Sequence, residues 1–370
     1  CLSPESPMSV RVLIVDDSAV MRALLTRKLE DDAGIEVVGT APNAAEARRM
    51  IKSLDPDVVT LDIEMPGMDG LSFLQKIMEL RPTPVIIVSG ATGPGAEATA
   101  RAMQLGAVSC YAKSTRHRSI ADDDQGMLVK LVHEAAQVTL PAPRKAQASP
   151  PSAPSARPAS RAQTSSNIPM PDLIAIGSST GGVEALHELL AQFPVHCPPT
   201  LIVQHINACF APAIAKSLDR VARPRVRLAE HNRPLAKGEI VIAPGDTGHL
   251  TIRPALGTSA SASWSAKITE GAPVSGHCPS VDALFNAVAT HVGAQALGIL
   301  LTGMGRDGAQ GLKAMAGTGC TTIAQDEATS VVFGMPRAAI ELGAAQHVLP
   351  LGEIAPRIFS ACADTQRKAS

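Results

Sequence analysis

The sequence predicts an α/β protein in which two doubly wound parallel sheets are joined by a linker rich in Pro, Ala and Ser. On both sides of the middle of the chain, short β-branched runs alternate with segments of helical periodicity, which is typical of parallel sheets covered on both faces. Between them, residues 140–171 read LPAPRKAQASPPSAPSARPASRAQTSSNIPMP and show no apolar periodicity. A chain of 370 residues fits two domains.

The first part of the chain predicts one five-stranded sheet. The expected strands are Val10–Val15, Glu36–Gly39, Val58–Leu61, Val85–Val88 and Ala107–Tyr111. Helices are expected between them, the first over Ser18–Glu30, where Ser18 is a favourable N-cap. Function is expected at the carboxyl ends of these strands, where open parallel sheets place their sites.

The second part begins with the same alternation. The expected elements are a strand at Asp172–Ile176, a helix at Gly181–Gln192, a strand at Thr200–Gln204 and a helix from about Ala213. From Val226 to Lys267 the turns are closely spaced, which predicts antiparallel strands at a sheet edge. Helix–strand alternation resumes at Ser280 and continues to about Ala361.

Composition excludes several classes of function. Aromatic residues make up 2% of the chain and the formal net charge is −1, so neither base stacking nor electrostatic binding of nucleic acid is expected. The seven cysteines form no C-x-x-C pair, which predicts reduced thiols in a cytoplasmic protein. The sequence contains neither an apolar stretch long enough to span a membrane nor a signal-peptide core at its start, so no direct membrane insertion is expected.

Charged residues follow the predicted strands of the first sheet. Asp16 and Asp17 follow the first strand, Asp62 follows the third, and Lys113 ends the run AVSCYA. Clustered carboxylates repel one another unless they hold a cation, and oxygen ligands suit Mg²⁺. A carboxylate beside Mg²⁺ can accept a phosphoryl group, with lysine neutralising its oxygens. A helix cap is the alternative for a single aspartate, but it does not explain the whole set.

Three further residues predict a hydrolase in the second sheet. IGSSTGG forms a glycine-rich turn that can present a serine, with Gly177, Gly181 and Gly182 permitting the turn. His205 and Asp307 follow later strands, so both are expected at the same sheet edge. A phosphate or dinucleotide loop is the alternative for the turn, but the second strand ends in Gln-His rather than in the acid that such a site needs.

Over about Val10–Gln137, the pattern DD…LDIEMPGMDG…S…K resembles the response-regulator receiver domain. The resemblance implies a flavodoxin-like domain over 8–139 and Asp62 as the phosphoacceptor. It implies that Mg²⁺ is held by Asp16, Asp17, Asp62 and the backbone carbonyl of Glu64, with Ser89 and Lys113 as the switch hydroxyl and lysine. Two positions depart from the usual pattern: Ser114 stands where proline follows the lysine, and Cys110 stands at the aromatic switch position.

Over about Asp172–Ala361, the motifs IGSSTGG, QH, IAPGD, GHCPSVD, LTGMGRDG and IAQDEATSVVFGMP resemble the catalytic domain of the chemotaxis protein-glutamate methylesterases. The resemblance implies a Rossmann-like domain over 172–364, with 140–171 as the flexible linker. It implies Ser179 as nucleophile, His205 as general base and acid, Asp307 as the orienting carboxylate and the Met304 backbone N–H as oxyanion donor. Residues 206–210 (Ile-Asn-Ala-Cys-Phe) and Cys278 depart from the family's usual residues.

Together these resemblances imply phosphorylation-activated hydrolysis of glutamate γ-methyl esters on the cytoplasmic helices of chemoreceptors, giving sensory adaptation. Some members also deamidate receptor glutamine, which the same nucleophile can perform. A sensory histidine kinase is the expected phosphodonor, and the esterase chemistry is expected to need no cofactor. A phospho-regulated binding module without catalysis is the other hypothesis; a transcription-factor output is weaker because the chain has no basic recognition helix.

Overall fold

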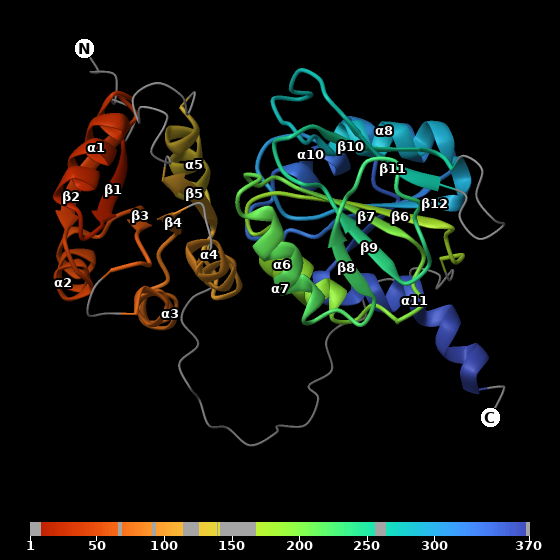
Figure 1. Cartoon of the computed structure of the whole chain (residues 1–370), viewed down its shortest axis with the longest axis horizontal. Coiled ribbons are helices and arrows are strands. Elements are labelled where there is room, and N and C mark those ends of the chain that lie inside the picture. Colours follow the sequence, from red (N-terminus) through yellow and green to blue (C-terminus); the bar gives the residue numbers. More distant parts are fainter. Residues whose placement is uncertain are drawn as a thin grey trace, which may run out of the picture.

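The computed structural model describes residues 9–65, 69–90, 94–113, 126–138, 140, 168–255 and 264–367. They form two α/β units, each with a central parallel sheet and helices on its faces (Figure 1). The fold class predicted from sequence is confirmed. None of the helices in these described ranges is both long and apolar enough to cross a membrane.

The first sheet has the order β2-β1-β3-β4-β5, and its neighbouring strands pair in parallel. This order is typical of flavodoxin-like doubly wound sheets. Its strands are β1 (Val10–Val15), β2 (Ile35–Ala41), β3 (Val58–Leu61), β4 (Val85–Gly90) and β5 (Ser109–Lys113). Its helices are α1 (Ala19–Glu30), α2 (Ala44–Leu54), α3 (Gly70–Leu80), α4 (Pro94–Gln104) and α5 (Met127–Ala136). Ser18 caps α1 as predicted, because its side chain accepts a hydrogen bond from the Met21 N–H.

The second sheet has seven parallel strands in the order β14-β13-β12-β6-β7-β9-β8. They are β6 (Leu173–Ser178), β7 (Thr200–Gln204), β8 (Arg225–Leu228), β9 (Glu239–Ile242), β12 (Ala296–Leu300), β13 (Thr321–Gln325) and β14 (His347–Leu349). Its helices are α6 (Gly182–Leu190), α7 (Ala211–Asp219), α8 (Val281–His291), the short 3₁₀ helix η1 (Gly293–Gln295), α9 (Ala309–Gly317), α10 (Met335–Glu341) and α11 (Leu351–Arg367).

One detail of the predicted second sheet is wrong. The sheet edge formed by β9 and β8 is parallel, and the antiparallel pair in this region forms a separate two-stranded sheet of β10 (His249–Pro254) and β11 (Trp264–Thr269). Residues 229–238 connect β8 to β9 without a tight hairpin, so the chain can return and pair in the same direction. Closely spaced turns therefore indicated an antiparallel pair correctly but not its place in the fold.

Helix α8 packs closely against β6 at Gly177, beside the serine turn. A Cβ atom added at Gly177 would lie 2.2 Å from Cγ1 of Val281, the first residue of α8. Two buried elements cannot separate there without losing core contacts, so a methyl group is not tolerated at this position. Glycine at the end of β6 thus allows the start of α8 to lie against the sheet.

We expect Gly177→Ala to lower the free energy of unfolding by about 1–3 kcal/mol, because it overpacks the β6–α8 contact. Urea unfolding followed by circular dichroism measures the change. Gly317→Ala is the matched control, since an added Cβ would meet no atom within 4 Å there. Equal stability of the two variants would contradict the proposed role of Gly177.

The two units contact each other through α4 and α5 of the first and through α6, α7 and the serine turn of the second (Figure 1). Lys216 on α7 forms an exposed ion pair with Glu97 on α4, at 2.6 Å. Nearby, the side chain of Gln104 at the end of α4 lies 2.7 Å from Nε2 of His187 on α6. The interface thus brings α5 over the carboxyl edge of the second sheet.

Candidate active site

Ser179 directly follows β6 and lies in a tight turn that leads into α6. Its N–H donates to the Thr302 carbonyl at 3.0 Å, and its carbonyl accepts from the Gly182 N–H at 2.8 Å. Gly181, the N-cap of α6, has φ of 75°, a conformation that favours glycine. The sequence folds into this turn because three glycines surround the two serines. Ser179 therefore lies on backbone held by two strands, β6 and β12.

The two serines of the turn point in different directions. Ser178 is buried and donates to Oε1 of Gln204 at 2.7 Å, whereas Ser179 lines a cavity of about 570 Å³. Nε2 of Gln204 in turn donates to the Ser179 carbonyl at 2.8 Å. Gln204 therefore braces the turn, a role that the motif QH did not reveal. Of the two hydroxyls, only that of Ser179 is placed to meet a substrate.

His205 follows β7 and lines the same cavity as Ser179. Its backbone N–H donates to the Ser178 carbonyl at 3.1 Å, which places the imidazole beside the serine turn. Its Nε2 lies 2.8 Å from Oδ2 of Asp307, and its Nδ1 is buried without a hydrogen-bond partner among the described residues. The structure thus joins His205 to Asp307 and leaves one ring nitrogen available for a proton, although it records no Ser179–His205 hydrogen bond within these ranges.

Asp307 is buried and accepts hydrogen bonds from donors on and before the first turn of α8. The Ser280 hydroxyl donates to Oδ1 at 2.7 Å, the Val281 N–H to Oδ2 at 2.7 Å and the Asp282 N–H to Oδ1 at 3.0 Å. Burial alone would raise the pKa of Asp307, but the hydrogen bonds from His205, Asp282 and Ser280 outweigh it and lower the pKa. Asp307 is therefore held as a carboxylate that can orient and stabilise a protonated His205.

His277 is a cavity residue to which the sequence assigned no role, although GHCPSVD contains it. Its ring stacks on that of His205, with centroids 3.9 Å apart and planes 4° from parallel. Paired backbone hydrogen bonds of 3.0 Å between Val274 and His277 hold the hairpin that delivers it. Burial, followed by the charge of His205, lowers the pKa of His277 to about 3. The His277 ring is therefore uncharged near neutral pH, and its stacking restrains the plane of the His205 ring.

Gly303 and Met304 follow β12 and lie at the serine turn. A Cβ atom at Gly303 would lie 2.7 Å from Cβ of Ser179, so only glycine lets this backbone approach the serine. The Gly303 N–H donates a hydrogen bond to the Val332 carbonyl at 3.0 Å, so it is already engaged. Met304, the predicted oxyanion donor, is the next residue along this backbone. Its position after the close approach is compatible with an N–H aimed at a bound acyl group.

The predicted residues of the first sheet gather at its carboxyl edge. One oxygen from each of Asp16, Asp17 and Asp62 can be chosen so that all three lie within 4.8 Å of one another. Lys113 lies 2.8 Å from Oδ2 of Asp16 and 2.6 Å from Oδ2 of Asp62. Ser89 is buried near the end of β4, on the adjacent strand. The structure therefore brings together the three acids and the lysine that the sequence singled out.

Burial and ion pairing compete at this edge. Burial raises the pKa of Asp16, and the bond from Lys113 offsets only part of the rise. Burial also opposes the charge of Lys113, but the bonds to Asp16 and Asp62 together outweigh it and raise the pKa of the lysine. Three carboxylates that share a single lysine leave negative charge uncompensated, so the cluster can accommodate a further cation. Its oxygen donors fit Mg²⁺.

The positions that depart from family patterns lie mostly around the cavity. Ile206, Asn207 and Cys278 line it from the second unit, and Cys110 lines it from β5 of the first. Cys209 is partly buried close by, and Phe210 is fully buried in the core. Ser114, the remaining departure, lies outside the described residues. Ile206, Asn207, Cys278 and Cys110 therefore form part of the cavity wall rather than its chemical centre.

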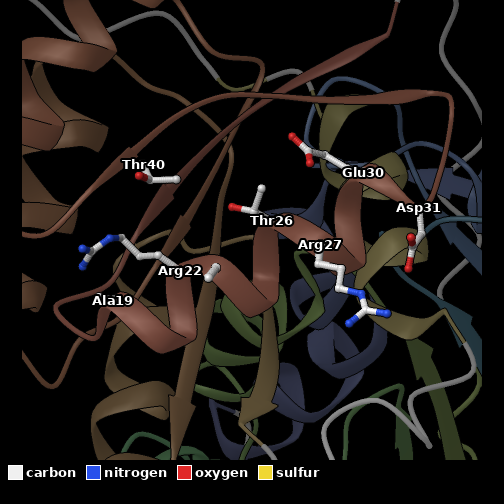
Figure 2. A pocket seen from close by; sticks show the side chains of 8 residues that line it. Ala19, Arg22, Thr26, Arg27, Glu30, Asp31 and Thr40 are labelled. Carbon is white, nitrogen blue, oxygen red and sulfur yellow. The ribbon is translucent and has the colours of Figure 1, made fainter.

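A second hollow lies on the outer face of α1 and is unrelated to this chemistry. Figure 2 shows its labelled lining residues, among them Arg22, Arg27, Glu30 and Asp31 along α1 and Thr40 on β2. Its lining contains neither a histidine nor a cysteine that would provide a base or a thiol nucleophile. The candidate active site is therefore the cavity at Ser179.

The chain matches known proteins over both units. A family model described as CheB methylesterase matches residues 174–358, and a response regulator receiver domain model matches residues 12–123. A protein-glutamate methylesterase/protein-glutamine glutaminase of Caulobacter vibrioides is 47% identical, covering 95% of this chain and 97% of its own length. A relative of the same description from Rhizobium etli is 46% identical, covering 94% and 95%. The solved Thermotoga maritima CheB methylesterase catalytic domain is 32% identical, with a TM-score of 0.48, covering 51% of this chain and 97% of its own.

Proposed function

The chain belongs to the CheB methylesterase family, and from this premise we propose how its residues hydrolyse glutamate γ-methyl esters on chemoreceptors. Ser179 attacks the ester carbonyl while Nδ1 of His205 takes its proton. The Met304 N–H stabilises the negative charge that develops on the carbonyl oxygen. Methanol then leaves with a proton from His205, and a water molecule releases the glutamate from Ser179 by the same steps.

The observation that carries this proposal is the Asp307–His205 pair beside Ser179 in one cavity. Asp307 accepts from Nε2 of His205, so the available nitrogen is the one that can act on the serine. The stacked His277 ring keeps the His205 imidazole from rotating out of this arrangement. Incubation of the pure chain with labelled methylated receptor membranes tests the proposal, because labelled methanol must appear.

We also propose that the same site deamidates receptor glutamine. Attack of Ser179 on the amide carbonyl forms the same acyl-enzyme, and ammonia leaves in place of methanol with its proton supplied by His205. The relatives named above are described as having both activities. Release of ammonia from unmodified receptor membranes tests this part.

We infer that phosphorylation of Asp62 controls the esterase. Asp16, Asp17, Asp62 and the Glu64 carbonyl would hold Mg²⁺, which would supply positive charge for the phosphoryl oxygens. Lys113 would neutralise the group transferred to Asp62, and the Ser89 hydroxyl would donate a hydrogen bond to it. A sensory histidine kinase would be the donor in a cytoplasmic pathway. The support is the oxygen-rich cluster at Asp62 and the position of this unit against the active-site cavity.

We expect Asp62→Asn to leave basal methanol release unchanged and to remove its stimulation by acetyl phosphate with Mg²⁺. The amide cannot accept a phosphoryl group, so the switch has no covalent trigger. Asp57→Asn is the matched control, because Asp57 lies at the opposite end of the same strand and accepts from the Arg11 N–H. Undiminished stimulation of the Asp62 variant would overturn the switch assignment.

A further inference from the structure

A glutamate of the first unit enters the active-site cavity of the second. Glu134 lies on α5 and is 7% exposed, and the cavity that it lines also holds Ser179, Thr180, His205 and His277. The Thr180 hydroxyl donates to Oε2 of Glu134 at 3.2 Å. Thr180 directly follows the nucleophile in sequence. A carboxyl group on a helix of the first unit therefore enters the cavity of Ser179 and is hydrogen-bonded to the residue that follows this serine.

The hydroxyl that holds Glu134 is fixed in place. The Thr180 carbonyl accepts from the Thr302 hydroxyl at 3.0 Å, and the Thr302 N–H donates to Oε1 of Gln325 at 2.8 Å. These bonds tie Thr180 to β12 and β13 independently of α5. Because the donor is positioned by its own domain, it is available to any acyl oxygen that reaches the cavity when α5 is absent.

The proposed reaction, on which this inference rests, converts a glutamate ester on a helix into a glutamate on a helix. We propose that Glu134 mimics that product. Its carboxyl occupies the acyl subsite, by which we mean the part of the cavity at Thr180 that binds the acyl group of the receptor glutamate. The Thr180 hydroxyl binds the acyl group in both cases. The docked receiver domain thus competes for the subsite that the receptor must fill. Because the competitor belongs to the same chain, it acts at high effective concentration.

The state of the Glu134 side chain supports this role. Burial raises its pKa, while Lys130, Thr180 and His205 offset the rise in part. A raised pKa favours the protonated form of this carboxyl, and that form has the same charge as the methyl ester and the glutamine amide. Glu134 therefore brings into the cavity a glutamate side chain carried on a helix, as the receptor glutamate is.

A second glutamate at the interface, Glu97, forms an exposed ion pair outside the cavity. Glu97 on α4 pairs with Lys216 at 2.6 Å, but their side chains are 60% and 58% exposed and the pair does not line the cavity. Exposed pairs contribute little to association. Glu97 therefore provides a matched control, since its replacement removes an interdomain carboxylate without touching the acyl subsite.

The first test compares receptor demethylation by the full-length chain and its variants. Glu134→Ala is expected to raise kcat/KM without phosphodonor by roughly threefold to tenfold, because it removes a buried hydrogen bond and an occupant of the subsite. Glu97→Ala is expected to change it less than about twofold. With acetyl phosphate the Glu134→Ala variant and the unmodified chain should converge, since α5 is then withdrawn from the subsite in both. Equal effects of the two alanine variants would overturn the proposal.

The second test makes the side chain at position 134 a substrate. In Glu134→Gln, Ser179 can attack the side-chain amide carbonyl at position 134, ammonia leaves with a proton from His205, and water then breaks the ester bond to Ser179 to give glutamate. Mass spectrometry of the peptide carrying position 134 should show conversion of the introduced glutamine to glutamate. Glu134→Gln combined with Ser179→Ala should show no conversion.

The outcomes separate this inference from the proposed function. If the Glu134→Gln chain deamidates receptor glutamine but keeps its own introduced amide, position 134 is not presented to Ser179 and the inference is wrong. A chain that releases neither methanol nor ammonia from receptor membranes, even with phosphodonor, contradicts the proposed function itself. If the chain releases methanol but no ammonia from receptor membranes, the glutamine test cannot apply. The inference is then decided by comparing kcat/KM for demethylation between Glu134→Ala and Glu97→Ala.

Discussion

Replacing Ser179 by alanine is expected to abolish methanol release from methylated receptor, with a loss of kcat on the order of a million-fold. The other two hydroxyls of the serine turn are already engaged: Ser178 donates to Gln204, and Thr180 donates to Glu134. Without Ser179 no acyl-enzyme can form, and binding alone does not break the ester. Labelled methanol release, measured with acetyl phosphate present, gives the rate.

Ser178→Ala is the control for this experiment. It removes a hydroxyl one residue away that donates to Oε1 of Gln204 and does not line the cavity. We expect a small loss of stability from the unpaired amide oxygen and retention of most of the activity. If Ser179→Ala keeps the rate of the unmodified chain, the nucleophile has been assigned to the wrong residue.

Replacing Asp307 by asparagine is expected to lower kcat by about ten-thousand-fold, as when the orienting acid of a triad is lost. All four groups that contact its carboxylate are donors: Nε2–H of His205, the Ser280 hydroxyl and the backbone N–H groups of Val281 and Asp282. An amide NH₂ turned toward His205 would move the imidazole proton to Nδ1, so the ring could no longer accept from Ser179. Turned the other way, it would face the donors before and at the start of α8.

Methanol release measured together with urea unfolding separates the two consequences of this substitution. Asp326→Asn provides the control, because Asp326 follows the neighbouring strand β13 and its side chain caps a turn by accepting from the N–H and the hydroxyl of Thr329. It should retain full activity. A folded Asp307→Asn enzyme that turns over at the normal rate would show that His205 needs no orienting acid.

Strand positions could be predicted closely where the chain carries short buried β-branched runs. The expected strands Val10–Val15, Val58–Leu61 and Thr200–Gln204 agree with the structure in both bounds. All three are central in parallel sheets, where both faces are buried and the run has clear ends. Acids and polar groups at their carboxyl ends are then brought together by topology alone, which is why Asp16, Asp62, His205 and Asp307 could be singled out.

Partners that meet through loops or between domains could not be predicted in the same way. His277 reaches His205 through a hairpin whose local sequence gives no distance to β7. Glu134 reaches Thr180 only because two separately folded units dock, and helical periodicity places it no differently from any half-buried acid. The parallel pairing of β8 with β9 depends on where a ten-residue connection returns, which turn residues alone do not specify.

The attachment of Asp307 to the start of α8 bears on how such an enzyme changes during evolution. Its carboxylate is held by Ser280 and by the first two N–H groups of a helix packed on the sheet, so its alignment is a property of the scaffold. Ile206, Asn207 and Cys278 contribute no donor to it and form the rim of the cavity. Substitutions at these cavity positions can therefore change receptor preference during evolution without altering the geometry of the Asp307–His205 pair.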